Sequence, residues 1–174
     1  SHAHEPLQRG PEAKRPFEKL HVDLFQNRGM NYLAAVDEYT GWPSLVVLGK
    51  DISSNSVIQG LRKIYLTHCA PVILKSDGGR QLVSEETKKF LHKWGVTLQI
   101  SSPHLPRTNG RAEATVKTLK KLVEGCCKPE CTTPNPDDLM AGILAIRNSP
   151  KYGGRSPAEM LLGRNVRDTI PTHP

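Results

Sequence analysis

The feature that most constrains the fold is a series of three apolar segments close together in the first third of the chain. They cover about residues 20–26, 31–37 and 43–49, and only the short stretches Asn27–Gly29 and Asp37–Gly41 separate them. Segments of this length, rich in Val, Leu and aromatic residues, are typical of β-strands. Short turns join antiparallel neighbours, so the sequence predicts an antiparallel meander of three strands.

A different pattern follows, in which helical and extended segments alternate. Helical spacing of apolar residues predicts helices at about 53–68 and 84–94, and strands are predicted at 72–76 and 96–100. The side chains expected to face inward from the second helix are Phe90, Leu91 and Trp94. Strand–helix–strand units require crossover connections and hence parallel pairing. The fold class is therefore α/β, with a mixed five-stranded sheet flanked by helices.

The rest of the chain is predicted to be helical with irregular connections. Two prolines and a glycine make residues 101–110 a loop, which leads to helices at about 110–125 and 137–148. The tail from Gly153 to Pro174 is expected to wrap the surface. We divide the chain into a linker at 1–16, one core domain at 17–150 and a C-terminal extension of that domain at 151–174.

Size and charge narrow the classes of function. The chain has 174 residues and a formal net charge of +7, which favours an anionic partner, with nucleic acid first. We expect no membrane partner, because no apolar run approaches about 18 residues and no signal peptide is visible. We also expect an intracellular protein and no small-molecule substrate. Reduced thiols are expected, with zinc or a disulfide as alternatives, at Cys69, Cys126, Cys127 and Cys131.

Three acidic residues lie where carboxylates are unusual. Asp23 lies inside an apolar run, Asp77 ends another and precedes Gly78-Gly79, and Glu113 opens the helix at 110–125. A carboxylate in a buried strand is costly unless a cation or hydrogen bonds compensate it. Carboxylate oxygens are the ligands that Mg²⁺ prefers, so these three residues are the candidate metal ligands. Turn or cap positions are predicted for the competing acids Asp37, Glu38 and Asp51.

The helix at 110–125 combines an apolar stripe with a basic face. The stripe comprises Ala112, Val116, Leu119 and Val123, and one residue further on lie Glu113, Lys117, Lys120 and Glu124. The cations in and before this helix are Arg107, Arg111, Lys117, Lys120 and Lys121. A carboxylate at the head of such a face suits a site that holds metal and binds phosphates. The alternative is a solvated helix face with an incidental Glu–Lys pair.

Weaker candidates surround these residues. His21 is a possible base but is better explained as a packed or hydrogen-bonded imidazole. His104 either contacts nucleic acid or is a solvated loop residue, and Asn109 either caps the helix or touches substrate. Gly78-Gly79 forms a phosphate-binding turn or simply a tight turn after a strand.

The chemistry explains why carboxylates are needed. Two divalent ions roughly 3.5–4 Å apart can activate a water or 3′-hydroxyl and stabilise the leaving oxygen during attack on phosphorus. In our hypothesis Asp23 bridges two ions, and Asp77 and Glu113 each complete one side. The expected cofactor is therefore a divalent ion such as Mg²⁺, with two ions per active site.

Several motifs together resemble the catalytic core of integrases from gypsy-class LTR retrotransposons and retroviruses. The most specific stretch is Ser101-Ser-Pro-His-Leu-Pro-Arg-Thr-Asn-Gly-Arg-Ala-Glu113. Further matches are Arg15–Asp23, Ser76–Gln81, Lys93-Trp-Gly-Val, Asn148-Ser-Pro and Ser156–Arg164. The resemblance covers about residues 16–170. The family usually has Asn where Gly78 stands and Arg where Ala114 stands.

This resemblance implies a ribonuclease H-like fold and a metal-dependent enzyme that trims 3′ ends of element DNA and joins them to target DNA. It implies that Asp23, Asp77 and Glu113 are the metal-binding triad, and that Lys117 and Lys120 contact element-end DNA. His104 and Asn109 match positions in the active-site loop. The resemblance also implies a homodimer that forms higher multimers on DNA, and a nuclear location.

Two alternatives share this fold. One is a ribonuclease H-type nuclease, which is disfavoured because that group tends to add a fourth carboxylate and none is well placed here. The other is a domesticated host protein that kept the core as a DNA- or protein-binding module with weak or no catalysis. An intact triad favours the enzyme.

Overall fold

The protein is built on one five-stranded sheet, shown by a computed structural model that describes residues 11–101, 110–151 and 153–169. The strands are β1 (Lys19–Asn27), β2 (Met30–Asp37), β3 (Pro43–Gly49), β4 (Ile73–Ser76) and β5 (Thr97–Ile100). Their order across the sheet is β3-β2-β1-β4-β5. The β1–β2 and β2–β3 pairs are antiparallel, and the β1–β4 and β4–β5 pairs are parallel. The predicted mixed sheet is thus confirmed.

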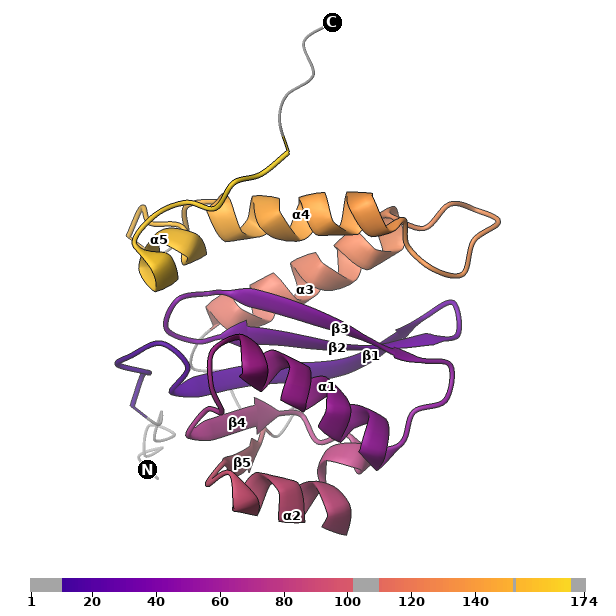
Figure 1. Ribbon diagram of the computed structural model, residues 1–174, viewed down its shortest axis with the longest axis vertical. Coiled ribbons are helices and arrows are strands. Elements are labelled where there is room, and N and C mark those ends of the chain that lie inside the picture. The colour runs from indigo at the N-terminus through magenta and orange to yellow at the C-terminus, as the bar shows by residue number, and fades with distance from the viewer. Residues whose placement is uncertain (1–10, 102–109, 152, 170–174) are drawn as a thin grey trace, which may run out of the picture.

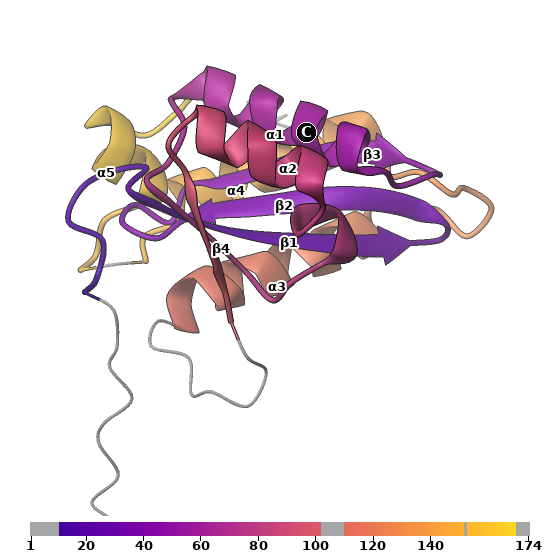
Figure 2. The same ribbon diagram turned by 90° about the horizontal axis from the view of Figure 1, so that it is seen from below.

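Helices cover both faces of the sheet, so the molecule has three layers (Figures 1 and 2). The helices are α1 (Ser54–Thr67), α2 (Glu85–Lys93), α3 (Gly110–Gly125), α4 (Pro136–Asn148) and α5 (Pro157–Leu162), with a 3₁₀ turn, η1, at Arg80–Leu82. One core cluster joins α1 and α2 to the sheet, and a second joins α3 and α4 to its opposite face. No helix in these ranges is both long and apolar enough to cross a membrane.

Strand β2 is the centre of the core because both of its faces are covered. Leu33 and Ala35 belong to the cluster under α1, whereas Ala34 and Val36 belong to the cluster under α3. Successive side chains of a strand point to opposite faces, so this near-continuous apolar run fits a strand buried on both sides.

The turn between β1 and β2 lies where the sequence predicts it. Arg28 and Gly29 both have positive φ, 51° and 82°. Two-residue hairpin turns with positive φ match the natural twist of the strands they connect. The Arg28 guanidinium also donates to the carbonyls of Lys128 and Cys131, at 2.5 and 2.7 Å. This turn therefore anchors the connection between α3 and α4.

The sequence predicts that the tail after α4 wraps the surface, with no helix in it, but the tail contains α5. Ser156 caps this helix in a capping box with Glu159, and Gly163 ends it in a left-handed conformation. Ala158 packs with Phe17 and Trp42, and partly buried Leu161 and Val166 join them. The C-terminal segment thus packs on the core; the proposed domain boundaries stay a prediction.

A second prediction was wrong for Trp94. Phe90 and Leu91 are buried as expected, but Trp94 is 57% exposed. Trp94 is the C-cap residue of α2, and Gly95 follows with φ of 65°. Helical periodicity no longer applies beyond the last turn, so the side chain lies on the surface.

Candidate active site

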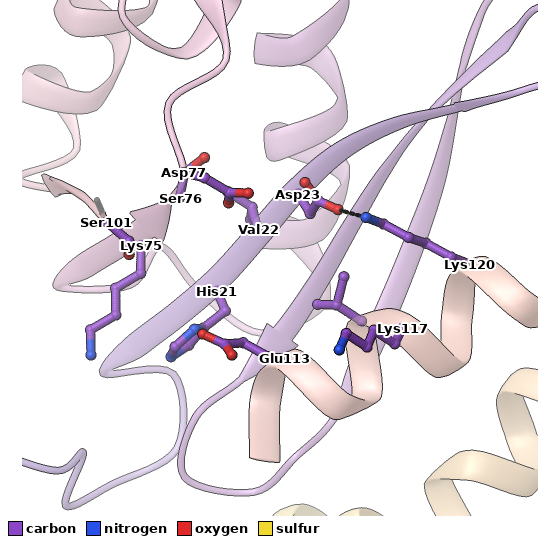
Figure 3. Close-up of a pocket in the computed structure, with 11 residues that line it drawn as sticks. His21, Val22, Asp23, Lys75, Ser76, Asp77, Ser101, Glu113, Lys117 and Lys120 are labelled. Atoms are coloured by element: carbon purple, nitrogen blue, oxygen red, sulfur yellow. Dashed lines mark ion pairs between the residues drawn. The ribbon is translucent and has the colours of Figure 1, made fainter. Parts of the chain in front are cut away.

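The three candidate ligands line one pocket of about 240 Å³ at the edge of β1, β4 and α3 (Figure 3). Asp23 and Glu113 are partly buried and Asp77 is exposed. The described residues that line the pocket are His21, Val22, Asp23, Lys75, Ser76, Asp77, Ser101, Glu113, Val116, Lys117 and Lys120. Three elements that are far apart in sequence thus contribute carboxylates to one cavity.

The strand register explains why Asp23 and Asp77 meet. Strands β1 and β4 run parallel, and His21 is the Cα partner of Lys75. Asp23 and Asp77 lie two residues beyond these partners, at the end where β4 stops. Residues two apart on a strand share a face, so the Asp23 and Asp77 side chains lie on the same face of the sheet as His21 and Lys75.

Helix α3 places Glu113 over this edge. Its predicted apolar stripe is confirmed, because Ala112, Leu119 and Val123 are fully buried and Val116 is nearly so. Ala112, Val116 and Leu119 of the stripe share a core cluster with Ala34 and Val36 of β2. The adjacent face carries Glu113, Lys117 and Lys120 into the pocket lining, as Figure 3 shows. The packing of the stripe therefore fixes which residues face the pocket.

An ion pair connects α3 directly to β1. The Lys120 Nζ lies 2.5 Å from Asp23 Oδ2, and their side chains are 44% and 19% exposed. The same Nζ lies 5.7 Å from the centre of the Phe25 ring, within cation–π range. Phe25 follows Asp23 by two residues, so carboxylate and ring share one face of β1. Sequence periodicity placed Lys120 near the site but did not predict this pair.

One of the acids predicted only as a turn residue, Glu38, is buried behind the pocket and holds part of its wall. Glu38 lies in the turn after β2, as predicted, but its side chain is only 3% exposed and pairs with Lys75 at 2.9 Å. Its carboxylate also bonds His21 Nε2 at 2.8 Å and accepts from the amide of Ala13. Burial by itself raises the pKa of Glu38, but the bonds from His21, Lys75 and Ala13 outweigh it and lower the pKa to about 2. Glu38 thus fixes two side chains of the pocket wall.

The other two acids behave as turn residues. Asp37 accepts hydrogen bonds from the Thr40 amide and hydroxyl and from the Phe17 amide. Burial nevertheless raises the pKa of Asp37. Asp51 lies in the exposed bend between β3 and α1.

The Gly78-Gly79 turn forms a lobe beside the pocket. This lobe of about 210 Å³ is lined by Asp23, Leu24, Ser76, Asp77 and the two glycines. Gly78 has a φ of 88°, which most side chains disfavour. A Cβ on Gly79 would lie 3.0 Å from Leu24 Cδ1. The backbone path therefore favours glycine at Gly78, where asparagine tolerates the left-handed region better than other residues, whereas close packing against Leu24 favours glycine at Gly79.

The donor set fits a hard divalent cation, since three carboxylates and no thiolate line the pocket. Within residues 11–101, 110–151 and 153–169, however, no three His, Cys, Asp or Glu side chains are gathered closely enough to hold a metal ion. Figure 3 shows Glu113 pointing toward His21 and Asp23 pointing toward Lys120. The assignment of the triad as metal ligands therefore stays a prediction.

The expected DNA contacts divide into three groups. Lys117 and Lys120 line the pocket. Arg111 and Lys121 are exposed on α3 and lie outside the described lining. Arg107, Asn109 and His104 lie outside the described residues. The four cysteines are free thiols, and none lines this pocket.

Comparisons with known proteins agree on the family. The Integrase core domain family matches residues 13–106, more than half of the chain. An uncharacterized protein of Caenorhabditis elegans is 32% identical over 168 residues, and the Gag-Pol polyprotein of walleye dermal sarcoma virus is 26% identical over 162. These alignments cover 95% and 91% of this chain but only 13% and 9% of those proteins. The chain therefore spans about a tenth of the length of such relatives.

Solved structures agree on the fold. The simian T-cell lymphotropic virus intasome in complex with PP2A regulatory subunit B56 gamma contains a chain with a TM-score of 0.75 and 16% identity, covering 95% of this chain and 62% of that one. The catalytic core domain of BIV integrase gives 0.67 and 17%, covering 84% and 95%. The magnesium complex of the HTLV-2 integrase core, in its dimeric form, gives 0.67 and 14%, covering 85% and 97%.

These neighbours confirm the predicted ribonuclease H-like fold. The matched sequence includes Asp23 and Asp77, two of the three pocket carboxylates. The chain belongs to the integrase core domain family.

Proposed function

We propose that this chain is the catalytic core of a divalent-metal-dependent polynucleotidyl transferase that trims 3′ ends of DNA and joins them to target DNA. The observation that carries the proposal is the pocket in which carboxylates from β1, the end of β4 and α3 lie together with Lys117 and Lys120. Membership of the integrase core domain family supports the reaction class.

The residues have distinct roles in this proposal. Asp23, Asp77 and Glu113 would hold the divalent metal through their carboxylate oxygens. The bound Mg²⁺ or Mn²⁺ supplies activation of a water or 3′-hydroxyl and stabilisation of the leaving oxygen. Lys117 and Lys120 bind DNA phosphates, and the Gly78-Gly79 turn lets a strand approach the backbone closely.

The partners follow from the same chemistry. We propose element ends and target DNA as substrates, and a homodimer that forms higher multimers on DNA. The dimeric HTLV-2 core supports the dimer by analogy of fold. A reaction on chromosomal DNA implies a nuclear location.

The test is a DNA-joining reversal assay on branched DNA with Mn²⁺. Wild type is compared with Glu113→Gln and with Glu124→Gln, a matched control on the exposed part of α3. We expect wild type and Glu124→Gln to release the joined strand and Glu113→Gln to give no detectable product. Equal and absent activity in wild type and Glu113→Gln would overturn the catalytic proposal.

A DNA- or protein-binding module without catalysis is the second candidate. The Lys120–Asp23 pair favours it, because it supplies a counter-ion for Asp23 from within the chain. This candidate predicts salt-dependent DNA binding that is the same in wild type and Glu113→Gln, with no product in either. Cleavage of an RNA–DNA hybrid in preference to branched DNA would instead indicate a ribonuclease H-type nuclease.

A further inference from the structure

The carboxylates of the pocket are largely neutralised by lysines of the same chain. Among the described residues, Asp23, Asp77 and Glu113 line the pocket together with three lysines, and buried Glu38 pairs with one of these, Lys75. Four carboxylates against three ammonium groups leave a charge of −1, so a divalent cation added to this set leaves an excess of positive charge. Binding of the cation is therefore favoured by any change that removes a lysine from the carboxylates or brings in a phosphate.

The three lysines differ in what holds them. Lys75 is 14% exposed and is held from behind by buried Glu38. Lys120 is 44% exposed and is held by Asp23, a proposed metal ligand. Lys117 is exposed and has no ion pair among the residues that the structure describes. Lys120 is thus the lysine that directly neutralises a candidate ligand.

The position of Lys120 allows it to be displaced. Its ammonium reaches Asp23 and the Phe25 ring from an exposed position on α3, one helical turn from Lys117. An ion pair with an exposed member is weak, because water screens the charges and ordering the side chains costs entropy. Exchange of this contact for a DNA phosphate therefore has a small cost.

We propose that Lys120 is an internal counter-ion of Asp23 which a divalent cation must displace, and that a DNA phosphate which takes up the Lys120 ammonium raises the metal affinity of the site. This inference rests on the proposed metal-binding function of the triad. Coupling between two ligands is reciprocal, so the metal also raises the affinity for DNA. The pocket thereby binds metal weakly until DNA is present.

The first experiment measures Mn²⁺ affinity of the full chain without DNA, by the electron paramagnetic resonance signal of free Mn²⁺ at about 0.15 M salt. We expect Lys120→Gln to bind Mn²⁺ about 3- to 5-fold more tightly than wild type, as removal of an exposed pair predicts. Lys89→Gln removes the same charge from an exposed position on α2, on the opposite face of the sheet from α3, and we expect less than about a twofold change. Lys120→Arg keeps the pair and should behave as wild type.

The second experiment repeats the titration with a short DNA duplex present. Wild type and Lys89→Gln should gain Mn²⁺ affinity when DNA is added, and Lys120→Gln should gain less. Equal Mn²⁺ affinities of Lys120→Gln and Lys89→Gln, with equal responses to DNA, would overturn the counter-ion role.

The two proposals fail in different ways. One outcome is that Asp23→Asn abolishes Mn²⁺ binding but Lys120→Gln does not strengthen it. This outcome contradicts the counter-ion role of Lys120 and supports the metal site. Absence of Mn²⁺ binding in wild type and Lys120→Gln alike contradicts both proposals. Circular dichroism confirms that each variant is folded, and Lys120 is exposed enough that its substitution leaves the core intact.

Discussion

At the scale of single residues, the acidic side chains show which roles can be predicted from neighbouring residues in the sequence and which cannot. Asp23 could be predicted because a carboxylate inside an apolar run needs a compensating partner. Glu38 could not, because its partners His21 and Lys75 are 17 and 37 residues away and only the fold brings them together. Glu38, predicted only as a turn residue, thus belongs to a buried cluster of charged and polar side chains.

Glu38 should make the stability of the protein depend on pH. Its pKa is lowered to about 2 in the folded chain, so its stabilising effect is complete above its ordinary value near 4.5 and is lost as the pH falls toward 2. We expect Glu38→Gln to lower the free energy of unfolding by about 1–3 kcal/mol at pH 7. The variant should also lose less stability than wild type between about pH 5 and pH 2.

Urea denaturation at several pH values measures both effects. Exposed Glu124 provides the matched control, and Glu124→Gln should retain the wild-type stability and pH dependence. The charge-cluster account fails if Glu38→Gln loses as much stability with falling pH as wild type does.

At the scale of secondary-structure elements, periodicity predicted helices well where one face is apolar. The stripe of α3 is buried as expected, and the residue numbers of α1, α3 and α4 differ from the predictions by at most one residue at each end. Helix α5 was missed because its six residues are too few to show a period. The signal that could have revealed it is the Ser156-Pro157…Glu159 capping box.

The stripe of α3 should carry most of the stability that this helix contributes. Leu119 is fully buried against β2, so Leu119→Ala should lower the free energy of unfolding by about 2–5 kcal/mol. Lys121 is exposed on the same helix, and Lys121→Ala should change it by less than about 0.5 kcal/mol. Chemical denaturation followed by circular dichroism compares the two; equal losses would contradict the assigned faces.

At the scale of the whole molecule, the fold class could be predicted from the order of strands and helices in the sequence. The contacts that join the two ends of the core domain could not. Phe17, Trp42 and Ala158 form a cluster that joins the start of the core to α5. Arg147 lies 4.2 Å above the Trp42 ring and donates to the Pro43 carbonyl. Such contacts depend on tertiary packing of segments more than 100 residues apart, which no local pattern encodes.

At the candidate active site, too, the local sequence predicts some features and tertiary packing determines the others. The sequence predicted which carboxylates share the pocket, because Asp23 lies inside an apolar strand, Asp77 follows another strand and Glu113 lies at the head of a helix. It did not predict the Lys120–Asp23 pair, which depends on how α3 crosses β1. Side-chain direction at such crossings is set by packing.

The net charge of +7 should make DNA binding depend strongly on salt. Lys117→Ala should weaken DNA binding at low salt. It should also make the plot of log affinity against log salt concentration less steep by about one unit, which corresponds to one lost phosphate contact. Fluorescence anisotropy at several salt concentrations measures this slope. A slope and affinity equal to those of wild type would remove Lys117 from the phosphate contacts.

The most direct measurement of the central claim is anomalous X-ray diffraction from crystals grown with Mn²⁺. We predict manganese peaks bonded to the Asp23 carboxylate, shared with Asp77 and Glu113, at metal–oxygen distances near 2.1 Å, with the Lys120 ammonium withdrawn from Asp23. Peaks that avoid these three carboxylates, or a Lys120–Asp23 pair that persists at saturating Mn²⁺, would contradict the account.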